Sequence, residues 1–384
     1  FHYLDSAATS QMPAAVLDAL CRFETEQRAN VHGGVHRLAR VAMKKYEDAR
    51  AAVAAYINAA SPQEVVFTYG TTSSINLAAQ SYGSFLGEGD EVVISLLEHH
   101  SNIVPWQMLA QRRGVVLKAI PVTPDGRLDL RRLEDVVTEK CRLIAVTHCS
   151  NVTGAVTDTG PLVDAARAVG AKLFLDGAQR IPHGPVDVQA LGTDFYAFSG
   201  HKVFGPTGIG ILWAQGDLLE RMPPFMGGGQ MIDRVTIEAS TYAKPPRRFE
   251  AGTPPIAGAI GLGAAVRWAQ SLDWPTLVAR ELALTGRILD RLRGIAGARL
   301  IGPQGTQQRR GVVSFTIVGL DVWDLCRLLD EHGVAVRCGH HCAQPLLSAF
   351  GVGAVARASL AVYSCDADVD ALLNGIEDGV SRLG

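Results

Sequence analysis

The stretch DFYAFSGHK at residues 194–202 determines how the rest of the chain is interpreted. Its apolar and aromatic residues lead into a turn of small residues that carries Lys202, and a second apolar run at 209–213 follows the turn. The pattern predicts that Lys202 is buried inside the protein. Because burial disfavours the ammonium form, such a lysine has a lowered pKa, and its neutral amine can attack a carbonyl carbon to form a Schiff base. A lysine whose ammonium reaches solvent is the ordinary alternative.

The composition is that of a globular protein with two domains. A chain of 384 residues is too long for one simple core, and 47% of its residues are hydrophobic. A net charge of −2 favours neither a nucleic-acid surface nor a membrane surface as partner. Seven scattered cysteines suit free thiols in a reducing compartment, so we expect a cytoplasmic protein. The sequence shows no signal peptide and no apolar run of about 18 residues that could span a membrane.

Short apolar runs alternate with helical patterns through the first part of the chain. The expected strands lie at 65–67, 92–94, 115–117, 143–146, 173–175 and 209–212, and a clear helix is expected at 161–169. Continuous apolar strands that alternate with helices indicate an α/β fold with a largely parallel sheet covered on both faces. In such sheets ligands bind at the carboxyl ends of the strands.

The last part of the chain predicts a second, smaller unit. The proline- and glycine-rich segment 222–258 is interpreted as loops over the site or towards a partner. Strands at 312–315, 334–336 and 358–361 and a last helix at 369–383 indicate a compact α+β domain. We therefore expect a large domain at 21–258 and a small domain formed by 1–20 and 259–384.

Polar residues follow several of the expected strands. Thr71 and Thr72 open a helix after the first strand, where backbone amides and hydroxyls make a phosphate cradle, although an ordinary helix cap is the alternative. Ser199 and His201 can add donors to this cradle.

Asp176 directly follows another strand, and Gln179 comes three residues later. A carboxylate beneath a pyridine ring keeps the ring nitrogen protonated, which makes pyridoxal 5′-phosphate (PLP) an electron sink. Gln179 is placed to donate to the phenolate oxygen of the same ring. A post-strand aspartate that only caps a helix is the alternative. Together with Lys202, these residues predict a PLP site.

His99 and Asn151 follow two further strands. An imidazole at residue 99 can stack on the cofactor ring and move protons near neutral pH. The adjacent His100 leaves metal binding or a surface turn open as alternatives. Asn151 is a candidate hydrogen-bond partner of the cofactor or the substrate.

The hexapeptide 337–342, RCGHHC, carries several reactive side chains. A metal site is disfavoured, because one short loop can hardly wrap contiguous ligands around zinc at bonds of about 2.0–2.3 Å. A nucleophilic thiolate at Cys342, with histidines nearby, fits better. Arg357 offers a planar fork for a substrate carboxylate. We expect no metal site.

With these residues assembled, the chain resembles the class V aminotransferase family, and within it the cysteine desulfurases with a short cysteine-bearing loop (SufS/CsdA-like). The motifs that carry the resemblance are SGHK at 199–202, DGAQ at 176–179, EHH at 98–100, HHCAQP at 340–345 and RASL at 357–360. Cys338 is unusual in this pattern and is a candidate for sulfur exchange with Cys342.

The resemblance implies the PLP-dependent transferase fold of type I, with a mainly parallel seven-stranded sheet in the large domain. It implies a homodimer in which Thr253 reaches the neighbouring subunit's cofactor phosphate. The implied reaction converts L-cysteine, held by Arg357 and Asn151, to L-alanine. Lys202 would take the α-proton, Cys342 would accept the sulfur as a persulfide, and His99 would donate a proton. A small SufE/CsdE-like acceptor protein would receive the sulfur.

Alternatives to this reaction remain open. A selenocysteine lyase uses the same apparatus without depending on Cys342. An ordinary aminotransferase would give Cys342 no role. A PLP-fold scaffold without catalysis is the non-enzymatic alternative.

Overall fold

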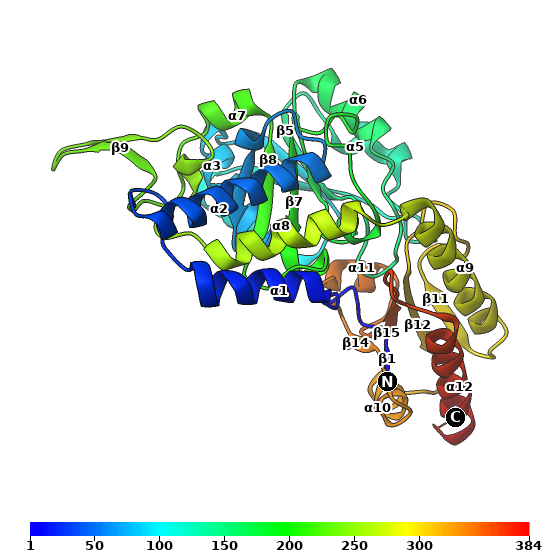
Figure 1. The fold of residues 1–384 in the computed structure, drawn as a ribbon. Helices are drawn as coiled ribbons and strands as arrows, with labels where there is room; N and C mark the ends of the chain where they lie inside the picture. The colour runs from blue at the N-terminus through cyan, green and yellow to red at the C-terminus, as the bar shows by residue number, and fades with distance from the viewer. Residues whose placement is uncertain (384) are drawn as a thin grey trace.

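A seven-stranded sheet forms the larger part of the computed structural model, which describes residues 1–383 (Figure 1). In spatial order its strands are β2 (Val65–Thr68), β8 (Gly210–Ala214), β7 (Phe195–Ser199), β6 (Lys172–Asp176), β5 (Cys141–Thr147), β3 (Glu91–Ser95) and β4 (Val116–Ile120). Only β8 runs against the others, because it pairs antiparallel with both β2 and β7 while the remaining pairs are parallel. The mainly parallel sheet predicted from the sequence is confirmed, and six strands end at one edge.

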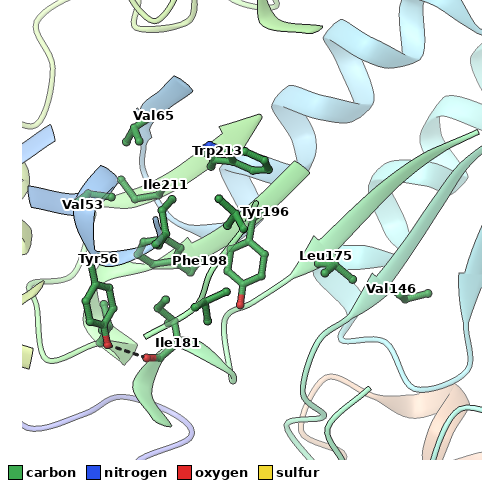
Figure 2. Packing of buried hydrophobic residues seen from close by; sticks show 14 of the residues in the cluster. Val53, Tyr56, Val65, Val146, Leu175, Ile181, Tyr196, Phe198, Ile211 and Trp213 are labelled. Atoms are coloured by element: carbon green, nitrogen blue, oxygen red, sulfur yellow. Dashed lines mark hydrogen bonds between the residues drawn. The ribbon is translucent and has the colours of Figure 1, made fainter. Parts of the chain in front are cut away.

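Helices cover both faces of this sheet. They are α1 (Ala14–Arg22), α2 (Arg37–Tyr56), α3 (Thr71–Ser81), α4 (Val104–Arg113), α5 (Leu133–Val136), α6 (Gly160–Val169), α7 (Gly216–Arg221) and α8 (Ile256–Gln270). Along β2, Val65 and Phe67 belong to one core while Val66 belongs to the other. Figure 2 shows the first core, where Val53 and Tyr56 of α2 lie near side chains of the sheet. Burial on both faces explains why the strands appear as continuous apolar runs.

A second, antiparallel sheet forms the other part of the fold. Its strands are, in order, β11 (Ala298–Ile301), β12 (Val312–Ile317), β15 (Val355–Ser359) and β14 (Arg337–Gly339). The helices of this part are α9 (Trp274–Arg293), α10 (Val322–Glu331), α11 (Gln344–Ala349) and α12 (Asp366–Leu383). The strand β1 (His2–Tyr3) pairs with β13 (Val334–Ala335), so the first residues of the chain join this unit, and Leu4 enters its core. The α+β unit expected at the end of the chain is present.

Three local predictions differ from the structure. The strand expected at 358–361 is β15 at Val355–Ser359, so Arg357 lies inside the strand rather than at its opening. Arg337–Gly339, treated as loop, forms β14. The segment 222–258 contains a hairpin of β9 (Ile232–Val235) and β10 (Ser240–Tyr242), which projects from the molecule in Figure 1. None of these strands presents a clean apolar run, so sequence periodicity missed or misplaced them.

The packing of α8 bears on the domain limits. The predicted boundary between residues 258 and 259 falls inside α8, and Ile260, Leu262 and Val266 of this helix share a core with Val53 of α2. The limits at 21–258 and 259–384 stay a prediction. Within residues 1–383, no helix combines the length and the apolar character that crossing a membrane requires.

A buried ion pair fixes α2 to the sheet. Arg50 donates to both carboxylate oxygens of Glu250, at 2.7 and 2.9 Å, and both side chains are buried. The same carboxylate accepts hydrogen bonds from Tyr46 Oη at 3.0 Å and from the Phe67 amide at 2.8 Å, and Arg50 also donates to the Val65 carbonyl. The network joins α2, β2 and the segment before α8.

We expect Glu250→Gln to lower the free energy of unfolding by up to about 3–5 kcal/mol, because it leaves the buried Arg50 with the partly exposed Glu47 as its carboxylate partner. Urea denaturation of the two proteins measures the difference. Lys44→Gln, which removes an exposed i,i+4 ion pair with Asp48, is the control and should change stability little. Equal stabilities of Glu250→Gln and the unmodified protein would contradict the role given to this pair.

Candidate functional site

A cavity of about 430 Å³ lies where the strands of the large sheet end and the small sheet begins. The residues that line it include eleven of the predicted site residues: Thr71, Thr72, His99, Asn151, Asp176, Gln179, Ser199, His201, Lys202, Cys342 and Arg357. These residues follow or end β2, β3, β5, β6 and β7, or lie in and beside β14 and β15. The fold therefore brings together side chains that the sequence spreads over almost 300 positions.

Close backbone packing fixes the turn that carries Lys202. This residue ends a short 3-10 turn directly after β7. A Cβ atom on Gly200 would lie 2.6 Å from Ile209 Cγ2, and one on Gly210 would lie 2.4 Å from Gly70 Cα, so larger residues would force these segments apart. Burial lowers the pKa of Lys202 to about 8, and the nearby Asp176 opposes this shift in part. A substantial fraction of the amine is therefore neutral near physiological pH.

Asp176 is the last residue of β6 and is buried. Its Oδ1 accepts a hydrogen bond from the Ala178 amide at 2.9 Å. Burial raises the pKa of this carboxyl, against the effects of that hydrogen bond and of Lys202. A positive group inside the cavity, such as the Lys202 ammonium or a protonated ring nitrogen of a ligand, would stabilise the carboxylate.

The start of α3 forms an anion cradle. The amides of a first helical turn have no acceptor within the helix, and the helix dipole favours negative charge there. Ser199 lies against this turn, with its Oγ 2.8 Å from the Thr71 amide and 2.7 Å from Thr71 Oγ1. Thr72 Oγ1 lies 2.8 Å from Ser101 Oγ. This set of hydroxyls and amides suits a phosphate group.

His99 has a neutral ring with a defined tautomer. Its Nδ1 accepts a hydrogen bond from the Ser101 amide at 3.1 Å, so the ring proton is on Nε2. Burial, and secondarily the charge of Lys202, lowers the pKa of His99 to about 3. At neutral pH the ring is therefore uncharged. It can stack on a ligand or donate one hydrogen bond from Nε2, but it lacks the second proton that an imidazolium ion would release.

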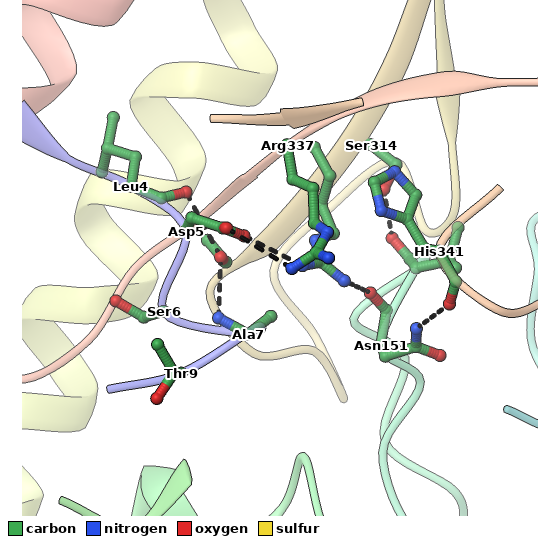
Figure 3. A network of polar contacts seen from close by, with 12 residues as sticks. Leu4, Asp5, Ser6, Ala7, Thr9, Asn151, Ser314, Arg337 and His341 are labelled. Atoms are coloured by element: carbon green, nitrogen blue, oxygen red, sulfur yellow. Dashed lines mark hydrogen bonds and ion pairs between the residues drawn. The ribbon is translucent and has the colours of Figure 1, made fainter. Parts of the chain in front are cut away.

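Arg357 is a buried guanidinium with incomplete pairing. It donates to the Asn151 carbonyl at 3.0 Å and pairs with Asp5 at 3.1 Å, whereas its Nε has no partner. Figure 3 shows Asp5, Arg337, Asn151 and His341 in this polar network. Burial lowers the pKa of Arg357, and Asp5 opposes the shift. Arg337 also approaches Asp5, at 3.7 Å. Arg357 and Arg337 share the single carboxylate of Asp5, so their positive charge exceeds its negative charge. The carboxylate of an amino-acid ligand would balance this excess.

The loop of Cys342 is a tight, strained turn. The Ala343 amide donates to the His340 carbonyl at 2.9 Å, and the two central residues, His341 and Cys342, have φ of 48° and 54°. Such values are costly for residues other than glycine and persist only where the surroundings enforce them. Asn151 Nδ2 holds the His341 carbonyl at 2.8 Å, and the His100 amide holds the Cys342 carbonyl at 2.7 Å. The turn places the Cys342 thiol within electrostatic range of Lys202 and Arg357.

Sequence reasoning missed several residues of the site. Asp5 pairs with both arginines, and the Ala7 carbonyl accepts from Gln179 Nε2 at 2.7 Å. Glu98, the first residue of the EHH motif, received no role from the sequence; it is fully buried, accepts from Asn102 and the Thr147 amide, and has its pKa raised to about 8 by burial. No local pattern identifies these roles, because each partner is distant in sequence or hidden in an ordinary-looking turn.

Thr253 lies apart from the other predicted residues. It is exposed and borders a second hollow, with Phe23 and Arg28 among its other lining residues. Its predicted contact belongs to a neighbouring subunit, and it stays a prediction. Among residues 1–383, no group of three His, Cys, Asp or Glu side chains converges as metal ligands would.

Known proteins resemble this chain over nearly its whole length. The family model of aminotransferase class V matches residues 2–372. A probable cysteine desulfurase of Streptomyces coelicolor is 47% identical over 98% of this chain and 91% of its own length. A cysteine desulfurase of Dickeya dadantii is 48% identical over 97% of this chain and 90% of its own length.

Solved structures agree with these sequence matches. The crystal structure of the cysteine desulfurase CsdA (S-sulfonic acid) from Escherichia coli has a TM-score of 0.93 at 40% identity and covers 100% of this chain and 95% of that one. The apo structure of a cysteine desulfurase from Thermococcus onnurineus reaches 0.96 at 38% identity, with the same coverage of both chains. The resemblance inferred from the motifs is confirmed: the chain belongs to the aminotransferase class V family.

Proposed function

We propose that the chain is a PLP-dependent cysteine desulfurase, which converts L-cysteine to L-alanine and takes the sulfur onto Cys342. The observation that carries the proposal is the convergence in one cavity of a low-pKa lysine, a buried carboxylate and a cysteine on a strained turn. The names of the relatives support it.

The residues present fit PLP. Lys202 would bind the aldehyde carbon, Asp176 would pair with the pyridine nitrogen, and the cradle of Thr71, Thr72 and Ser199, with His201 beside it, would hold the phosphate. When bound, PLP supplies an electron sink for the pair left on the substrate α-carbon. Gln179 already donates to the Ala7 carbonyl, which leaves its second N–H for the phenolate oxygen.

Each reacting residue has a distinct task. Arg357 binds the substrate carboxylate, with its unpartnered Nε completing the fork, while Asn151 braces both Arg357 and the cysteine turn. Lys202 takes the α-proton as a neutral amine. The low pKa of His99 favours stacking and hydrogen bonding over the proton donation expected from the sequence. Cys342 attacks the substrate sulfur, so that a S–S bond forms as the carbon–sulfur bond breaks.

The tethered turn also bears on delivery of the sulfur. Because hydrogen bonds from Asn151 and His100 hold the turn, the persulfide stays beside the cavity. We infer that a small acceptor of the SufE/CsdE kind docks there to receive it. The seven cysteines are free thiols, which suits the reducing cytoplasm.

A homodimer is part of the proposal. The hairpin of β9 and β10 projects from the molecule and carries Ile237, fully exposed, and Val235, largely exposed (Figure 1). Exposed apolar side chains of this kind gain stability by packing on a second subunit. Thr253 would then reach the neighbour's phosphate cradle.

Lys202→Ala should lower alanine formation from L-cysteine by about 10²–10⁴-fold, because the variant lacks both the attachment point and the base. Quantifying alanine and sulfide after incubation with L-cysteine and PLP measures the loss. Borohydride reduction and peptide mapping of the unmodified protein should fix the pyridoxyl label on Lys202. A label elsewhere would overturn the proposal.

Cys342→Ser should abolish persulfide formation and reduce alanine release from L-cysteine by about 10²-fold or more, since no thiolate remains to accept the sulfur. Cys21→Ser, which removes an exposed thiol on α1, is the matched control and should behave as the unmodified protein. Unchanged turnover of L-cysteine in Cys342→Ser would instead favour a selenocysteine lyase, and pyruvate with an aminated cofactor would favour an aminotransferase.

The rate of PLP attachment to cofactor-free protein should rise about tenfold per pH unit and level off above pH about 8, because only the neutral Lys202 amine attacks. Asp176→Asn should shift this profile to lower pH, since the aspartate raises the lysine pKa. Absorbance of the attached cofactor follows the reaction. A profile that is flat from pH 6 to 9, or unmoved by Asp176→Asn, would contradict the assignment.

A further inference from the structure

Two imidazole rings flank the Cys342 turn, and neither has a task in the proposed reaction. The Nδ1 atom of His340 accepts a hydrogen bond from the Cys342 amide at 3.0 Å. The Nε2 atom of His100 accepts one from the Gln344 amide at 3.1 Å. The two rings lie close together, with their centroids 5.7 Å apart and their planes inclined by 33°. Side-chain acceptors therefore hold the turn at the cysteine itself and at the residue that follows Ala343.

These contacts define the tautomers of both rings. Because a ring nitrogen that accepts carries no proton, the proton of His340 is on Nε2 and that of His100 is on Nδ1. Burial, and secondarily the neighbouring His340, lowers the pKa of His100. The His100 ring is therefore neutral at pH 7 and keeps its lone pair for the Gln344 amide.

The ring of His100 stands on a firm support. His100 begins a 3-10 turn, His100–Asn102, a few residues after β3. Asn102 in this turn donates to Glu98 at 2.7 Å and accepts from Trp106 Nε1 at 2.9 Å, and all three side chains are fully buried. The large sheet thus fixes the position of His100, and His100 in turn holds a loop of the smaller unit.

The amide that His100 binds has no acceptor within its own helix. Gln344 begins α11, and the first amides of a helix lack intrahelical partners. Ala343, the residue before the helix, has no polar side chain that could cap it. The acceptor comes instead from the turn after β3, more than 240 positions away in sequence. This contact is a cap that ties the end of the Cys342 turn to the large sheet.

We propose that His100 and His340 are positioning residues, which clamp the Cys342 turn so that its thiol faces the reaction cavity. This role rests on the proposed function, which makes Cys342 the sulfur acceptor. The positive φ angles of His341 and Cys342 are costly and persist only where neighbouring groups enforce them. Without the clamp the turn relaxes, and a displacement of about 1 Å between reacting atoms can cost about 10²-fold in rate.

The two histidines differ in their access to the chemistry. His340 and Cys342 line the cavity, whereas His100 does not. His100 acts only through the turn, so its replacement separates positioning from direct contact with the substrate. Glutamine at residue 100 and asparagine at residue 340 each keep an oxygen acceptor near the place of the imidazole nitrogen that they replace.

The first test uses the cofactor-free full-length chain and needs no turnover. The protein is treated with iodoacetamide, and peptide mapping gives the alkylation rate of each cysteine. The exposed Cys21 and the buried Cys149 serve as internal controls for reagent and for overall integrity. The variants are His100→Ala, His340→Ala, His100→Gln and His340→Asn.

Both alanine variants should alkylate Cys342 about 2–10-fold faster, because the loss of one hydrogen bond lets the turn open towards solvent. Cys21 should react equally in all the proteins, and Cys149 should stay unreactive. The glutamine and asparagine variants should react close to the rate of the unmodified protein.

The second test uses the PLP-loaded proteins and a single turnover of L-cysteine. His100→Ala should form the Cys342 persulfide and alanine about tenfold or more slowly, while the absorbance of the attached cofactor and the KM for L-cysteine stay unchanged. His100→Gln should recover most of the rate. A thiol that becomes easier to alkylate and yet slower to accept sulfur is the signature of lost positioning.

Several results would overturn the clamp. They are equal alkylation of Cys342 in all the proteins, alkylation of Cys149 in the alanine variants, which would show a general loss of structure, and an equal loss of turnover in His100→Ala and His100→Gln. Absence of alanine from the unmodified protein would instead refute the proposed function, and the alkylation rates would still decide whether the histidines hold the turn.

Discussion

The enclosure of one lysine amine is the constraint on which the site depends. Lys202 ends the turn after β7, in which Gly200 packs closely on Ile209, and Gly210 of β8 lies directly against Gly70 at the start of α3. Burial makes the ammonium costly and lowers the pKa of Lys202 to about 8, and the buried Asp176 keeps the shift from going further. Near neutral pH the Lys202 side chain is therefore a mixture of ammonium and neutral amine, and the neutral fraction is reactive.

Asn151 links the two halves of the chemistry. Its carbonyl accepts from Arg357, which binds the substrate carboxylate in our proposal, and its side chain holds the turn that carries Cys342. Because one residue makes both contacts, a shift of Asn151 would move both Arg357, the proposed substrate anchor, and the Cys342 thiol. The strained φ of Cys342 is maintained by these contacts and by His100, so the orientation of the thiol is a property of the assembled site rather than of the loop.

Much of the fold and of the site could be predicted, for identifiable reasons. Strands buried on both faces appear as apolar runs, and the carboxyl ends of parallel strands meet at one edge, so polar residues after strands were expected together. The hairpin at 232–242, the strand β14 and the place of Arg357 within β15 were not foreseen. The first is exposed, β14 spans only three residues, and in β15 a buried arginine interrupts the apolar pattern.

The sequence by itself determined the sheet and the identity of the candidate residues, because both are local properties: hydrophobic period, turn chemistry and reactive side chains just past a strand. Only the tertiary structure decided which charges face one another. Asp5 meets Arg357 through the pairing of β1 with β13. Such contacts join residues that are distant in sequence, and their geometry and burial set the pKa values on which the chemistry rests.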